Sequence, residues 1–106
     1  MYKVLPARSF ERDAKVLFKK YASLRNELAE LGKQLALNPT QGTPIGHNCY
    51  KIRQAIKSKG KGKSGGARII TYVIIEDETI ILLTIYDKSE KENLTTGELE
   101  ELLRAV

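Results

Sequence analysis

The sequence has few of the residues on which several classes of protein depend. Its single cysteine, Cys49, cannot form an internal disulfide or supply a four-cysteine zinc site, which favours a reducing compartment. The longest apolar run, Ile80–Leu83, is far too short to cross a bilayer. Residues 1–13 carry charges throughout and lack the apolar core of a signal peptide. We therefore expect a soluble cytoplasmic protein with no membrane partner.

Carboxylates are missing from a long central stretch. Residues 31–75 contain eight lysines and arginines but no aspartate or glutamate. The flanking segments differ, because residues 1–30 carry a net charge of +3 and residues 76–106 a net charge of −6. Surface lysines usually alternate with acidic residues, and these do not. The stretch predicts a polyanionic partner that is bound through its phosphates.

The length of 106 residues allows one globular domain, spanning residues 1–106. Apolar residues recur at helical spacing after Ser9, which has the residue type of a helix N-cap. From Tyr50 onward the periodicity changes to the alternation of strands. The expected elements are a strand at 2–5, helices at about 10–21 and 23–37, a loop at 40–48, strands at 50–57, 67–75 and 79–86, and a helix at 98–104. Thr95 and Glu98 have the spacing of a capping box ahead of this last helix.

This order, β-α-α-β-β-β-α, predicts an α+β fold in which two helices pack on one face of an antiparallel sheet. The opposite face would then be open. Strand alternation points Ile52 and Ile56 toward the helices and Lys51, Arg53 and Lys57 toward the open face. In the register assumed for the next two strands, the inward residues are Ile69, Thr71, Val73, Ile75, Ile81, Leu83 and Ile85, and the outward residues are Arg68, Ile70, Tyr72, Thr84 and Tyr86. The open face is then basic and bears tyrosines.

The most distinctive segment is residues 57–68, with the sequence KSKGKGKSGGAR. Its Gly62-Lys63-Ser64 is similar to part of a phosphate-binding P-loop. However, Lys57 stands where that motif needs a glycine, and the segment precedes a strand instead of a helix, so nucleoside triphosphate binding is not expected. Glycines let the backbone approach a ligand, and lysines at alternate positions line it with positive charge. A basic loop without chemistry is the alternative.

Four segments together resemble the RelE/ParE superfamily of bacterial toxins, and most nearly its HigB-like branch of RelE proteins. They are Lys51-Ile52-Arg53, the loop at 58–66, the run Gly66–Tyr72 and the run Leu82–Lys88. The resemblance extends over essentially the whole chain and includes the order of the elements. It implies a type II toxin that cleaves messenger RNA in the A site of the 30S ribosomal subunit. It also implies a cognate antitoxin that holds the toxin inactive.

The resemblance also assigns roles to individual residues. Transesterification of RNA needs a base for the 2′-hydroxyl, positive charge at the phosphorane and an acid for the 5′-oxygen. Arg68 matches the phosphate-binding arginine, whose planar guanidinium suits two oxygens. Lys51 and Arg53 match a basic pair that positions RNA, and Lys88 matches a residue that assists the leaving group. Because residues 31–75 lack carboxylates, we expect no metal and no other cofactor.

The general base is expected among the loop lysines, because neighbouring cations favour the neutral form of a lysine. The candidates are Lys57, Lys59, Lys61 and Lys63, with Lys61 and Lys63 preferred as the base and Lys57 and Lys59 assigned to RNA binding. RelE itself has a C-terminal tyrosine where this chain has Leu94. Tyr86 is expected to replace it, by stacking on a base or moving a proton. A packing role at the strand end is the alternative for Tyr86.

Structural roles are expected for four further residues: Tyr72 in packing, His47 on a surface loop, Cys49 as a buried apolar residue and Asp87 in a turn. Two other functions stay open. A ParE-like toxin would target DNA gyrase without cleaving RNA, although Arg68, Lys88 and the glycine-lysine loop argue against it. A non-catalytic RNA-binding module would stack bases on aromatic residues, and residues 51–71 contain none.

Overall fold

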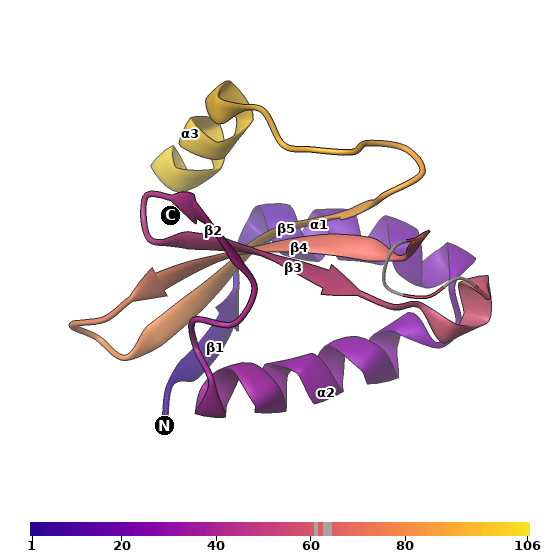
Figure 1. Cartoon of the computed structure of the whole chain (residues 1–106), viewed down its shortest axis with the longest axis horizontal. Helices are drawn as coiled ribbons and strands as arrows, with labels where there is room; N and C mark the ends of the chain where they lie inside the picture. Colours follow the sequence, from indigo (N-terminus) through magenta and orange to yellow (C-terminus); the bar gives the residue numbers. More distant parts are fainter. Residues whose placement is uncertain (61, 63–64) are drawn as a thin grey trace.

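The computed structural model describes residues 1–60, 62 and 65–106, which form a five-stranded sheet with helices on both faces (Figure 1). The strand order is β1-β5-β4-β3-β2. The elements are β1 (Lys3–Pro6), α1 (Arg8–Lys20), α2 (Leu24–Leu37), β2 (Thr43–Gly46), β3 (Cys49–Gln54), the 3-10 helix η1 (Lys57–Lys59), β4 (Ala67–Ile74), β5 (Thr79–Asp87) and α3 (Thr96–Arg104). The α+β class is confirmed. Among these described helices, none has the length and hydrophobicity that a membrane span requires.

The main core lies between the sheet and helices α1 and α2. Each helix buries residues three, four or seven positions apart, which is the spacing of an apolar stripe. The helix residues are Phe10, Ala14, Leu17, Leu24, Leu31 and Leu35, and they cluster with Ile52, Ile56, Ile69, Val73, Ile80 and Ile85. The predicted packing of two helices on one face of the sheet is confirmed.

The opposite face of the sheet is partly covered by α3, so the prediction of an open face was wrong in that region. Leu99 of α3 is buried in a second cluster with Ile70 and other apolar residues of the sheet. The neighbouring Ile69 belongs to the main core, so α3 and α2 lie on opposite sides of the sheet, as Figure 1 shows. A capping box starts α3, as its spacing predicted: Glu98 N–H donates to the Thr95 hydroxyl, and Thr95 N–H donates to the Glu98 carboxylate.

The sheet is mixed, since β1 pairs with β5 in parallel while the other neighbours are antiparallel. The pairing of β4 with β5 shifts after Ile70, where Leu83 is left without a partner. Such a bulge reverses the alternation of side chains along the strand. Leu83 and Ile81 consequently pack on the α3 side, contrary to the predicted register, whereas Ile85 beyond the bulge faces α1 and α2 as predicted.

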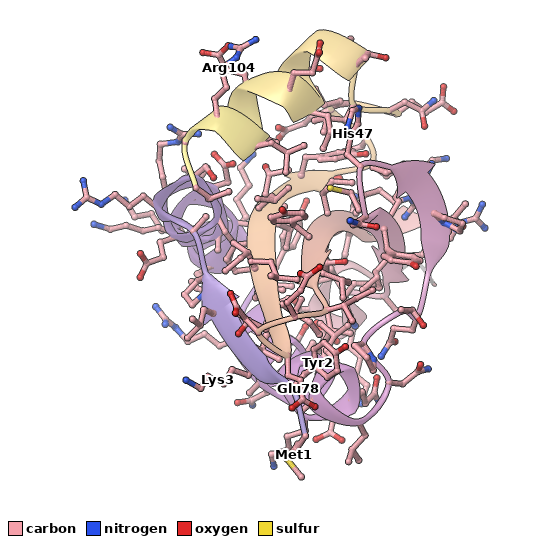
Figure 2. The ribbon with its side chains drawn as sticks, turned by 90° about the vertical axis from the view of Figure 1, so that its left-hand side faces the viewer. Met1, Tyr2, Lys3, His47, Glu78 and Arg104 are labelled. Carbon is pink, nitrogen blue, oxygen red and sulfur yellow. The ribbon has the colours of Figure 1, made fainter. Side chains whose placement is uncertain are left out.

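Strand β2 lies within the segment that was predicted to be a loop. It pairs with β3 through a tight hairpin in which His47 and Asn48 have φ angles of 55° and 60°. Positive φ at both central residues gives the twist that suits a two-residue hairpin. Pro44 obscured this strand, because proline is tolerated in strands mainly at sheet edges, where β2 lies. His47 is exposed at the hairpin tip, at the same end of the molecule as α3 and away from Met1 and Glu78 (Figure 2).

Several predicted element ends are shifted. Helix α1 begins after Ala7, so Ser9 is not its N-cap, and the Ser9 hydroxyl donates instead to the Leu83 carbonyl oxygen at 2.5 Å. Strand β4 ends before Ile75, which was predicted to point inward and is 62% exposed. Strand β3 ends at Gln54, so Lys57 lies in η1 and not on the strand.

Candidate anion-binding site

Arg53, Arg68 and Tyr86 stand in one row across the sheet. Arg53 of β3 pairs with Arg68 of β4, which pairs with Tyr86 of β5. Residues that face each other in this way lie roughly 5 Å apart on the same side of the sheet. The isoleucine next to each of them along its strand belongs to the main core, so the row faces away from α1 and α2, as predicted.

A cavity of about 270 Å³ opens beside this row. Among the described residues, its lining consists of Lys51, Arg53, Arg68, Lys88, Glu92 and Asn93. The Glu92 carboxylate lies 3.9 Å from Lys88 Nζ, but its side chain is 78% exposed, so solvent screens this pair. Positive charge is therefore in excess, and a concave cationic surface concentrates anions. We call this group of residues the cationic cavity.

Arg68 is the most deeply placed cation of the cavity. Its residue exposure is 3%, and its Nη1 donates to the Ala67 carbonyl oxygen at 3.1 Å. Burial lowers the pKa of Arg68, and the nearby charge of Arg53 lowers it further. A guanidinium nevertheless stays protonated at neutral pH. A guanidinium carries its N–H donors in a planar fork, a geometry that suits the oxygens of an anion.

The Tyr86 hydroxyl is buried and has no hydrogen-bond partner within the described part of the chain. Burial raises the pKa of Tyr86, although the neighbouring Arg68 charge opposes this shift. The phenol is thus neutral at physiological pH and has a proton to donate. Its ring adjoins a second cavity of about 100 Å³ that shares Lys51 and Asn93 with the cationic cavity. This position is compatible with both predicted roles of Tyr86, packing at the strand end and direct participation in the site.

The segment that follows β5 closes one side of the cationic cavity. Lys51 Nζ donates to Asn93 Oδ1 at 3.1 Å, which ties β3 to this segment. Asn93 and Glu92 were not predicted as site residues. Nothing in their sequence distinguishes them from other polar loop residues, and only the return of the chain between β5 and α3 brings them to the strands.

Lys57 and Lys59, the two loop lysines that the structure describes, have different surroundings. Lys57 is exposed in η1, where its backbone N–H donates to Glu27 of α2, and it lines another cavity beside that helix. The Lys59 side chain is only 11% exposed and forms an ion pair with Asp87. Neither lines the cationic cavity, so their roles in RNA binding stay predictions. Lys61 and Lys63 lie outside the described residues.

Asp87 is the centre of a buried polar cluster behind the cavity. Its carboxylate accepts hydrogen bonds from Lys59 Nζ at 2.5 Å, from Tyr21 Oη at 2.6 Å, and from the N–H and hydroxyl of Ser89. Burial raises the pKa of Asp87, but the bonds from Lys59, Tyr21 and Ser89 outweigh it and hold the pKa well below its usual range. The Ser89 bonds confirm the predicted turn, whereas the ion pair was not anticipated.

The fold and the cationic cavity together define a small α+β protein with a site suited to a phosphate-bearing partner. The family model described as "RelE toxin of RelE / RelB toxin-antitoxin system" matches residues 2–106. The chain therefore belongs to the RelE toxin family, as the sequence predicted. Its assignment to the HigB branch stays a prediction.

Two solved structures share this fold. The crystal structure of the isolated E. coli RelE toxin is 19% identical to the chain with a TM-score of 0.57, and the match covers all of both chains. A double arginine-to-alanine mutant of E. coli RelE in the free state is 18% identical with a TM-score of 0.62, covering 99% of this chain and 97% of that one. At these identities the likeness shows the fold, and the site must be argued from its own residues.

Proposed function

We propose that this toxin is a metal-independent endoribonuclease that cleaves messenger RNA in the ribosomal A site. The observation that carries the proposal is the cationic cavity, in which Lys51, Arg53, Arg68 and Lys88 converge from two strands and the segment after β5. The sequence predicts a role for all four residues in RNA binding or cleavage. Membership of the RelE toxin family supports the toxin role.

Each step of transesterification has a candidate residue. Arg68 binds the scissile phosphate and stabilises the charge that grows on its equatorial oxygens. Lys51 and Arg53 hold the flanking backbone. Lys88 assists departure of the 5′-oxygen, and the neutral Tyr86 phenol donates a proton or packs against a base. The base that accepts the 2′-hydroxyl proton is assigned to Lys61 or Lys63.

The proposed setting is the cytoplasm, where the toxin meets ribosomes and a cognate antitoxin. The net charge of +5 suits the ribosome, because ribosomal RNA is a polyanion. An antitoxin that inhibits cleavage would cover or distort the cationic cavity. Binding to RNA through several cations should weaken steeply as salt is raised.

The test is inducible expression of the wild type and of Arg68→Ala, with messenger RNA 5′ ends mapped after induction. Arg8→Ala serves as the matched control, because Arg8 is exposed at the start of α1. We expect growth arrest and new codon-phased 5′ ends for the wild type and Arg8→Ala, and neither for Arg68→Ala. Arrest with intact transcripts would instead support a ParE-like gyrase inhibitor. If the wild type is folded and causes no growth arrest, the result would support a non-catalytic RNA-binding module.

A further inference from the structure

Asp87 connects three separate parts of the chain. Its residue exposure is 2%, and within the described residues its partners come from the end of α1 (Tyr21), from η1 (Lys59) and from the following turn (Ser89). Burying a carboxylate is costly unless it is paired and hydrogen-bonded. Both conditions are met here, so the cluster has one favoured geometry.

The cluster lies directly behind the cationic cavity. Asp87 follows Tyr86 and precedes Lys88, which lines the cavity. Because the Asp87 side chain contacts Tyr21 and Lys59, it points to the α1 side of the sheet, away from the cavity. Asp87 therefore cannot touch RNA bound in the cavity, but it fixes the strand end from which Lys88 extends.

Asp87 and the adjacent Lys88 hold the two ends of the glycine-lysine loop. At the start of the loop, Lys59 is bound to the Asp87 carboxylate. At its end, the Gly66 carbonyl oxygen accepts a hydrogen bond of 3.1 Å from the Lys88 N–H. The segment that carries Lys61 and Lys63 thus begins and ends on two adjacent residues of β5 and its turn.

We infer that Asp87 is a positioning residue for cleavage, which sets the places of Lys88 and of the two described loop ends, Lys59 and Gly66, relative to Arg68. This inference rests on the proposed nuclease function. It gives Lys59 a partner within the protein: its charge neutralises Asp87 and does not bind phosphate. A small displacement of groups behind a reaction centre can lower the rate by about a hundredfold.

The test compares Asp87→Asn with Glu90→Gln in single-turnover cleavage of messenger RNA on programmed ribosomes, with toxin in excess. Glu90 is a matched control because it links the same turn to α1 through an exposed ion pair with Lys20. We expect Asp87→Asn to lower the rate constant at least about tenfold with an undiminished amplitude, and Glu90→Gln to cleave like the wild type. A purely structural role would lower the folded fraction, measured by circular dichroism, and leave the rate constant at saturating toxin unchanged.

A second measurement separates this inference from the proposed function. Amide exchange of Lys88 in the free toxin reports the hydrogen bond to Gly66 whether or not RNA is cleaved. We expect exchange at least about tenfold faster in Asp87→Asn than in Glu90→Gln. If the wild type does not cleave RNA but Lys88 still exchanges faster in Asp87→Asn than in Glu90→Gln, the nuclease proposal is refuted and the structural role of Asp87 in placing Lys88 is supported. Equal exchange, or equal rate constants in active proteins, would overturn the inference.

Lys59→Met provides the test if Asp87→Asn does not fold. It removes the charged partner and keeps the carboxylate with its bonds to Tyr21 and Ser89. We expect Lys59→Met to lower the rate constant at least about tenfold, because it removes the ion pair that holds Asp87 in place. Full activity of Lys59→Met would contradict the inference.

Discussion

Gly66 lies close to the backbone at the end of β3, and substituting it tests how tightly the two segments must pack. A Cβ atom at residue 66 would lie 2.0 Å from the Gln54 carbonyl oxygen and 3.1 Å from Ala55 Cα. Both are backbone atoms, so the strands have to move by about 1 Å to restore normal contact. We expect Gly66→Ala to destabilise the fold by about 1–3 kcal/mol, the usual cost of overpacking.

Gly62→Ala is the matched control in the same loop. A Cβ there would meet nothing within 4 Å, so this variant should be neutral or stabilised by about 0.5 kcal/mol through loss of unfolded-state entropy. Urea unfolding and thermal melts of both variants give the comparison, with a difference in Tm of roughly 10 °C expected. Equal stability of the two variants would refute the claim that β3 and the start of β4 require glycine at residue 66.

Three further predictions concern individual side chains. Tyr86→Phe removes a buried hydroxyl without a hydrogen-bond partner in the described chain, so thermal stability should be unchanged or raised by up to about 1 kcal/mol. If the hydroxyl takes part in cleavage, the rate should fall in that variant, and an unchanged rate would assign Tyr86 to packing. Leu99→Ala should cost about 2–4 kcal/mol in urea unfolding, because Leu99 is 5% exposed and fixes α3 to the sheet; a cost under about 1 kcal/mol would contradict that packing. Folding lowers the pKa of Asp87, so its contribution to the free energy of unfolding is complete above the unfolded value of about 3.8 and is lost as pH falls toward the folded pKa. The stability of Asp87→Asn should lack this dependence on pH in acid unfolding. Curves of stability against pH that run parallel for the wild type and Asp87→Asn would disprove it.

The sequence predicted those parts of the fold that depend on local periodicity. The apolar stripes of the two long helices and the capping box at Thr95 and Glu98 have local causes, and they were predicted correctly. The bulge at Leu83 was not, because an extra residue in a continuous apolar run leaves no mark on its composition. Strand β2 was missed for a related reason, since a proline-containing edge strand has the composition of a loop.

The site shows the same division between local and long-range causes. Arg53 and Arg68 could be placed on one face because each lies beside a core isoleucine, which fixes its direction. The partner of Lys59 could not be predicted, since Asp87 lies 28 residues further along the chain and only the fold brings the two together. The chain folds into η1 after Ile56, where the amides of Lys59 and Gly60 donate back to carbonyls three residues earlier.

The 3-10 helix η1 affects which residues supply the positive charge of the cationic cavity. In η1, Lys57 lines the pocket beside α2 and the Lys59 side chain pairs with Asp87, and neither lysine belongs to the described lining of the cationic cavity. The cations that line it come from β3, β4 and the residue after β5, where the sheet fixes their spacing. A rigid sheet positions charges more reproducibly than a glycine-rich loop does. Removing a cation from these strands should therefore weaken RNA binding more than removing Lys57, although both changes alter the net charge equally.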